Sequence, residues 1–124
     1  VTTPQDIAVL DAVKALNMFL LPNINIPILG IVENMAWFTP KELPNNKYYI
    51  FGKGGGEKLA KMADTSVLAQ IPLVQGIRES GDTGHQEGVD TSTLPIFDKM
   101  GQELIKSVEW RNKHKEATKI VEVQ

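Results

Sequence analysis

The sequence predicts an α/β fold in which a partial, parallel Rossmann-like sheet is flanked by helices. A continuous apolar run, residues 26–32, is typical of a strand buried on both faces of a parallel sheet, and SVLAQIP, residues 66–72, is predicted as a second buried strand closed by Pro72. Helical patterns precede, separate and follow these runs, as in layered α/β proteins. The opening VTTP reads as the end of a further strand that leads into a helix. Because this sheet is small for its class, we expect its N-terminal strands to be missing from the chain.

The first helix is expected over residues 4–20, with Thr3 as its N-cap and Pro4 at its first position. Apolar residues cover most of its circumference, which predicts packing against a large surface such as a sheet. Its only polar stripe consists of Asp11, Lys14 and Asn17.

The middle of the chain begins with an expected loop over residues 37–47, which contain two prolines and two asparagines. Residues 48–51 are expected to form a short extended piece. A short helix is then predicted over residues 57–63, before the second strand at residues 66–72.

The last part begins with an expected loop over residues 76–88, with one helical turn at residues 77–80. The final helix is expected to begin near Leu94 or Pro95. Residues 111–124 are polar and are expected to be a solvated tail of a single domain that covers residues 1–124. One face of the final helix carries apolar residues at helical spacing, namely Phe97, Met100, Leu104, Ile105 and Val108.

Composition narrows the function classes. The formal net charge of −2 favours neither nucleic acid nor an acidic membrane as a partner. The absence of cysteine excludes disulfides, thiolate metal sites and cysteine nucleophiles. The longest nearly apolar run, residues 24–32, is too short to span a bilayer, and no signal peptide is visible. We therefore expect a cytoplasmic protein with no catalytic triad and no metal site of its own.

The segment IFGKGGGEKL, residues 50–59, partly matches the phosphate-binding loop pattern G-x-x-x-x-G-K-[ST]. Alignment on Gly52 places Lys58 correctly, but Glu57 then occupies the second glycine position and Leu59 the hydroxyl position. A carboxylate repels a triphosphate and leucine cannot bind magnesium, so this is not a Walker A loop. Two interpretations stay open, a tight turn before a helix or a helix N-terminus that holds an anion or a backbone partner.

Four motifs together resemble the Mrp/ApbC-type ATP-binding iron–sulfur carrier proteins, which are P-loop ATPases with a deviant Walker A motif, like MinD and ParA. The motifs are VTTPQDIAVLDAVKALNMF, GIVENM, IFGKGGGEKLA and QIPLVQGIRESGDTG, in the family's order and spacing from Val1 to about Gly101. The resemblance is to the C-terminal half of such a protein. It implies ATP with magnesium as cofactor in a complete parent, slow hydrolysis at a homodimer interface and a role in iron–sulfur cluster assembly. The chain alone, without the family's phosphate loop, is expected to be inactive.

The resemblance also implies site residues. Asn34 matches the asparagine that hydrogen-bonds adenine, and an amide offers both a donor and an acceptor to a base edge. Pro72 matches a residue whose loop lines the base pocket, although proline also ends strands well. Arg78 and Glu79 match the residues that follow in the family, with an exposed ion pair as the alternative.

Two departures from the family matter. Relatives commonly carry a C-x-x-C motif after the VENM-like motif, but this chain has no cysteine there, so cluster binding in the usual way is not expected. Val74 and Gln75 replace the usual acidic and proline residues after IPL.

The loop that follows VENM carries aromatic residues and no cysteine. Three interpretations of the chain's function stay open: an ATPase half, a protein-binding or scaffold module, and a Rossmann-like domain for another small ligand. Candidate interface residues are Trp37, Phe38, Tyr48, Gly54 and Gly55, with a second copy or iron–sulfur assembly proteins as partners.

Overall fold

The computed structural model of the protein describes residues 1–85 and 91–120. Across these residues the elements follow in the order α1 (Asp6–Phe19), β1 (Ile31–Asn34), α2 (Gly55–Met62), β2 (Val67–Ile71), α3 (Gln75–Thr83) and α4 (Leu94–His114). The two strands are parallel neighbours. This order confirms the predicted alternation of helices with the strands of a small parallel sheet.

The sheet is extended on one side by the first residues of the chain. Thr2 forms a parallel bridge with Glu33. Its N–H donates to the carbonyl of Val32 at 3.0 Å, and its own carbonyl accepts from the N–H of Asn34 at 2.8 Å. The opening residues therefore lie beside β1 as a strand end, as the sequence predicts, with β1 between them and β2.

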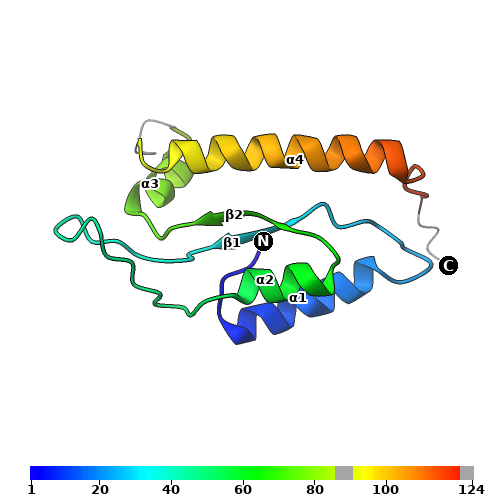
Figure 1. The fold of residues 1–124 in the computed structure, drawn as a ribbon, viewed down its shortest axis with the longest axis horizontal. Coiled ribbons are helices and arrows are strands. Elements are labelled where there is room, and N and C mark those ends of the chain that lie inside the picture. The colour runs from blue at the N-terminus through cyan, green and yellow to red at the C-terminus, as the bar shows by residue number, and fades with distance from the viewer. Residues whose placement is uncertain (86–90, 121–124) are drawn as a thin grey trace.

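Helices cover both faces of this sheet (Figure 1). Helices α1 and α2 lie together on one face, whereas α4 crosses the other face and packs on β2. The buried core lies between the sheet and the α1–α2 layer. It consists of Leu16, Ile31, Leu59 and Ala60.

The first strand differs from the prediction. Strand β1 covers Ile31–Asn34, whereas residues 26–30 of the predicted strand form no strand. The reason is the position of its partner, because β2 begins at Val67, which is paired with Ile31. Residues before Ile31 therefore have no β2 residue beside them, and the Thr65 hydroxyl donates instead to the Leu29 carbonyl at 3.2 Å.

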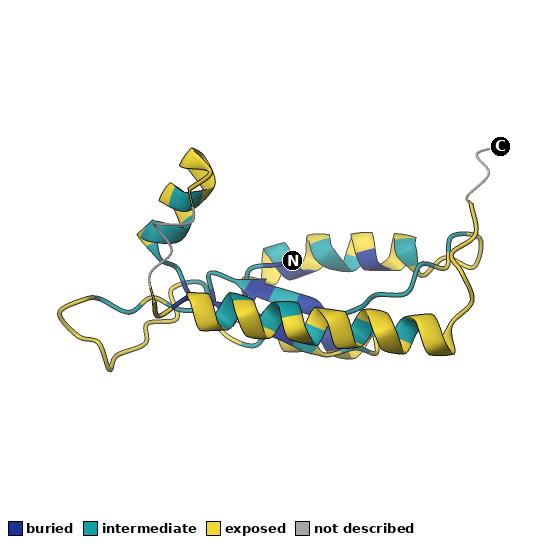
Figure 2. Cartoon of the chain, turned by 90° about the horizontal axis from the view of Figure 1, so that it is seen from above, coloured by how far each residue is buried: buried dark blue, intermediate teal, exposed yellow. Residues whose placement is uncertain are grey.

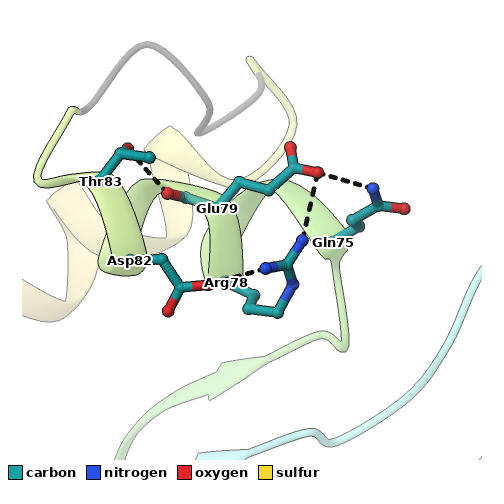
Figure 3. Close-up of polar contacts among 5 residues, drawn as sticks. All are labelled: Gln75, Arg78, Glu79, Asp82 and Thr83. Atoms are coloured by element: carbon teal, nitrogen blue, oxygen red, sulfur yellow. Dashed lines mark hydrogen bonds and ion pairs between the residues drawn. The ribbon is translucent and has the colours of Figure 1, made fainter.

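The helical turn predicted at residues 77–80 is confirmed, but the loop predicted around it is wrong for its first part, because α3 is a helix of nine residues. Side chains four residues apart bond along it, from Gln75 to Glu79 at 2.6 Å and from Arg78 to Asp82 at 2.7 Å (Figure 3). Gly84 ends the helix at φ 71°, a left-handed conformation that glycine adopts without strain. The rest of the predicted loop extends into residues 86–90, which lie outside the described residues.

Between β1 and α2 the chain forms an irregular loop that extends beyond the end of the sheet (Figure 1), as predicted for residues 37–47. Phe38 and Tyr48 form an isolated antiparallel bridge, in which the N–H of each donates to the carbonyl of the other at 2.8 Å. Of the expected extended piece over residues 48–51, only Tyr48 pairs with another segment.

Two helices expose more apolar surface than their sequences predict (Figure 2). In α1, Val9 and Leu16 are buried, but 72% of Ile7 and 63% of Leu10 are exposed. Helix α4 begins at Leu94, as predicted, and continues past Trp110 to His114. Phe97 and Met100 of its apolar face are half-buried, but the rest of that face is exposed, namely Leu104, Ile105 and Val108. Residues 112–120 are exposed, whereas residues 121–124 of the predicted tail lie outside the described part of the chain.

Candidate functional site at the carboxyl edge of the sheet

Asn34 is the last residue of β1, at the carboxyl edge of the parallel sheet. Its Oδ1 accepts the N–H of Met35 at 2.9 Å, and among the described residues its amide nitrogen bonds to no other group. The side chain is half-exposed. Ligands of open α/β sheets bind outside this edge, so Asn34 has a free donor where a ligand would be expected.

Pro72 lies at the same edge, because Asn34 is paired with Ile71 and Pro72 follows directly. Beyond the strands the two chain segments stay joined. The N–H of Ala36 donates to the Ile71 carbonyl at 2.9 Å, and the N–H of Leu73 donates to the Trp37 carbonyl at 2.8 Å. The fold therefore brings Asn34, Pro72 and the start of the loop over residues 35–54 to one end of the sheet.

Glu33, which precedes Asn34, is a buried carboxylate that the sequence analysis did not single out. Only 2% of the residue is exposed. Its Oε2 accepts the backbone N–H of Gly56 at 2.6 Å, and its Oε1 accepts from the amide nitrogen of Gln70 at 3.0 Å. A charged residue inside an otherwise apolar strand was a usable signal in the sequence, because carboxylates are rarely buried without partners.

The glycines of IFGKGGGEKL allow α2 to pack closely against its neighbours. A Cβ at Gly55 would lie 2.6 Å from the Pro4 carbonyl oxygen and 2.8 Å from Val9 Cγ2. A Cβ at Gly56 would lie 2.9 Å from both Cβ and Oε2 of Glu33. Gly54 precedes the helix at φ 79°, in the left-handed region. Of the two predicted interface glycines, Gly55 is buried within the chain and Gly54 is half-exposed.

The N-terminus of α2 therefore binds an anion, but this anion is the chain's own Glu33 carboxylate. One of the backbone N–H groups that an external phosphate would need is already bonded, and the carboxylate would repel it. This geometry agrees with the sequence argument against a Walker A loop. It also combines the two interpretations that the sequence left open, a turn before a helix and a helix N-terminus that holds an anion.

The aromatic loop, residues 35–54, carries two pairs of a lysine and an aromatic ring. Lys47 Nζ lies 4.0 Å from the centroid of the Trp37 ring, and Lys53 Nζ lies 3.8 Å from that of Tyr49. Apolar side chains are exposed along the same loop, namely Phe38, Leu43, Tyr48, Tyr49 and Ile50. Trp37 is half-buried and lines two open hollows beside β2, of about 370 and 290 Å³. Glu57 and Gln70 line both hollows as well.

Arg78 and Glu79 lie on α3, which packs against no other helix or strand among the described residues. The Arg78 guanidinium bonds to Asp82 at 2.7 Å and to Glu79 at 3.3 Å, and all of these side chains are exposed (Figure 3). Neither residue lines the two hollows beside β2. The structure thus joins Arg78 to Glu79 but gives these two residues no contact with Asn34 or Pro72.

The described part of the chain contains no group of three or more histidine, aspartate or glutamate residues that could hold a metal ion. With no cysteine in the sequence, these residues offer no iron–sulfur ligand set. No helix among residues 1–85 and 91–120 is long and apolar enough to cross a membrane.

A parallel sheet between helix layers is the architecture of the α/β class, in which ligands bind outside the carboxyl edge of the sheet. Comparison with protein families gives a specific assignment. Residues 1–111 match the family model described as ParA, NUBPL iron-transfer P-loop NTPase. The chain belongs to this family, in agreement with the resemblance to Mrp/ApbC-type proteins.

Curated relatives support the same assignment. The chain is 49% identical over 84 residues to an iron–sulfur cluster carrier protein of Synechocystis, covering 68% of this chain and 23% of the relative. It is 45% identical over 84 residues to the mouse iron–sulfur cluster transfer protein NUBPL, covering 68% of this chain and 25% of the relative. It is 39% identical over 110 residues to an iron–sulfur cluster carrier protein of Methanocaldococcus jannaschii, covering 88% of this chain and 37% of the relative. The chain thus spans between 23% and 37% of the length of these relatives.

Proposed function

We propose that the chain is the C-terminal portion of an Mrp-type ATP-binding protein that serves iron–sulfur cluster assembly or transfer. In this proposal the chain supplies the adenine side of the nucleotide site and part of a homodimer interface. The observation that carries it is the position of Asn34, which ends β1 at the carboxyl edge and has a free amide donor, in a chain of the NUBPL family.

The residues of this chain suit the base of ATP and not its phosphates. Asn34 offers an amide to the base, and Pro72 follows the neighbouring strand at the same edge. The glycine-preceded N-terminus of α2 is bonded to Glu33, so this proposal assigns the triphosphate and its magnesium to residues upstream of Val1. Bound ATP would supply the phosphoryl group that water attacks, giving ADP and phosphate. Arg78 and Glu79 stay a prediction from the resemblance.

The cluster is the cargo in this proposal. The relatives are named as carriers or transfer proteins of iron–sulfur clusters, and the chain itself has no cysteine. Any cluster would therefore be bound outside these 124 residues, by a partner or by upstream sequence. We propose that Trp37, Phe38 and Tyr48 contact the second copy or an assembly protein.

The proposal is tested by calorimetry with Mg-ATP on two proteins, the 124-residue chain and a complete parent that includes the residues upstream of Val1. The parent should bind ATP and hydrolyse it slowly, whereas the chain alone should show no measurable hydrolysis and at most feeble binding, because it lacks the phosphate contacts. Micromolar affinity of the chain alone would contradict this division of roles. Upstream sequence without a GKGGVGKS-like loop and an aspartate-ended strand would overturn the ATPase assignment.

A second candidate is a protein-binding or scaffold module without nucleotide or cluster chemistry. The exposed apolar residues of the aromatic loop favour it, because such patches are typical of protein interfaces. A complete parent that binds no nucleotide but captures a second copy through this loop would favour this candidate over the first.

A further inference from the structure

The two ends of the aromatic loop, residues 35–54, are joined by a single side chain. The loop leaves β1 after Asn34 and ends at α2, whose first residue is Gly55. Glu33 precedes the loop, and its Oε2 accepts the N–H of Gly56, which follows it, at 2.6 Å. The other oxygen accepts from Gln70 of β2 at 3.0 Å. One carboxylate therefore fixes the beginning and the end of the loop to the sheet.

The chemistry of this junction favours a carboxylate. Two donors, the Gly56 N–H and the Gln70 amide, point at the Glu33 side chain, and an ionised carboxylate is a pure acceptor. A glutamine at position 33 could keep both bonds only if the Gln70 amide turned its oxygen toward the new NH₂, and it would still lose the negative charge. The positive end of the α2 dipole also favours a negative charge at this point.

The rest of the loop is tied to its stem by further contacts. The N–H of Leu73 donates to the Trp37 carbonyl, and Phe38 and Tyr48 bond to each other. Lys47 covers the Trp37 ring. These contacts and the Glu33–Gly56 bond hold together the two ends of the loop, which carries the exposed apolar residues.

We propose that Glu33 is a positioning residue that locks the base of the aromatic loop and couples its position to the carboxyl edge of the sheet. Asn34 follows Glu33 directly, so an adenine base bound at Asn34 would restrict the motion of the backbone that carries Glu33 and, through Glu33, of Gly56. The Glu33 lock holds the loop in the conformation in which its exposed apolar side chains would contact a partner or a second copy. The coupling to nucleotide rests on the proposed function, whereas the lock itself does not.

Hydrogen exchange on the complete parent protein tests the lock, with Glu33→Gln as the perturbation and Glu57→Gln as its matched control. Glu57 is exposed in the first turn of the same helix, so its substitution removes an equal charge without touching the Glu33–Gly56 bond. Glu33→Gln should accelerate exchange at Gly56 and across residues 36–54 by about tenfold, the factor expected for a charge-assisted hydrogen bond. Glu57→Gln should leave these rates unchanged, and β2 amides should keep their protection in both variants.

A second variant covers the case in which Glu33→Gln does not fold. Gln70→Ala removes only the second donor, and Gln70 is exposed on β2, so the expected acceleration across the loop is smaller, about threefold. Unchanged loop exchange in both variants would overturn the lock. Equal acceleration in the loop and in β2 would also overturn it, since Glu33 would then contribute only to global stability.

The coupling is tested by repeating the exchange with Mg-ATP. In the wild type, ATP should further protect residues 36–54, and in Glu33→Gln this protection should be lost although ATP still binds. ATP-dependent protection that persists in Glu33→Gln would refute the coupling. A wild-type parent that binds no ATP would refute the proposed function instead, and the exchange measured without nucleotide would still decide the lock.

Discussion

Substitution of Gly55 by alanine tests whether close packing fixes the glycine segment before and within α2. In an ordinary helix interior, alanine is more stable than glycine by about 1 kcal/mol. At Gly55, however, the new Cβ would lie 2.6 Å from the Pro4 carbonyl oxygen, 2.8 Å from Pro4 Cα and 2.8 Å from Val9 Cγ2. Two of these three atoms belong to the backbone and cannot rotate away.

Overpacking of this kind costs about 1–3 kcal/mol, which exceeds the gain in helix propensity. Gly55→Ala should therefore lower the free energy of unfolding by about 1 kcal/mol net, a fall of roughly 4 °C in Tm. Gly101→Ala in α4 is the matched control, because a Cβ there meets nothing within 4 Å, and it should stabilise the protein by about 0.5–1 kcal/mol. Thermal unfolding followed by circular dichroism gives both values. A Gly55→Ala protein as stable as Gly101→Ala would refute the packing argument.

Two further substitutions test the core and the surface. Leu59→Ala should lower the free energy of unfolding in urea by about 2–5 kcal/mol, because Leu59 is 3% exposed and packs in the core. Met62→Ala, at a 59% exposed position of the same helix, should change the free energy of unfolding by less than about 0.5 kcal/mol. Similar losses of stability in Leu59→Ala and Met62→Ala would contradict the assigned core. Arg78→Ala should cost less than about 0.5 kcal/mol, because its ion pairs are exposed. In the complete parent, a large loss of Mg-ATP affinity would support the role that the resemblance implies for Arg78, and an unchanged affinity would leave the exposed ion pair as its only role.

The strands and most helices could be predicted because their signals are local. The apolar run at residues 26–32 and the segment SVLAQIP predict β1 and β2. The predicted first strand begins five residues before β1, because the start of β1 is set by its pairing with Val67 on β2. Of helix α3, the sequence predicts only one turn, at residues 77–80, and the helix extends beyond that turn in both directions. Its sequence also contains polar side chains spaced by four residues, and these bonds run along the helix in the structure.

The site was predictable where it lies at a strand end and unpredictable where it depends on tertiary contacts. Asn34 lies two residues after the apolar run at residues 26–32, so its place near the carboxyl end of the strand could be predicted from the sequence. The bond from Glu33 to Gly56 joins residues 23 positions apart, and no local pattern specifies it. For the same reason, the sequence excluded a Walker A loop but did not reveal that a carboxylate of the chain occupies the helix N-terminus.

The most direct test of the central claim, that this chain holds the base of ATP, is calorimetry on the complete parent and its Asn34→Ala variant. Each protein is titrated with Mg-ATP and with Mg-tripolyphosphate, which has phosphates but no base. Loss of the base hydrogen bonds should weaken ATP binding by about tenfold and leave tripolyphosphate binding unchanged. Equal ATP affinity in the two proteins would contradict the claim.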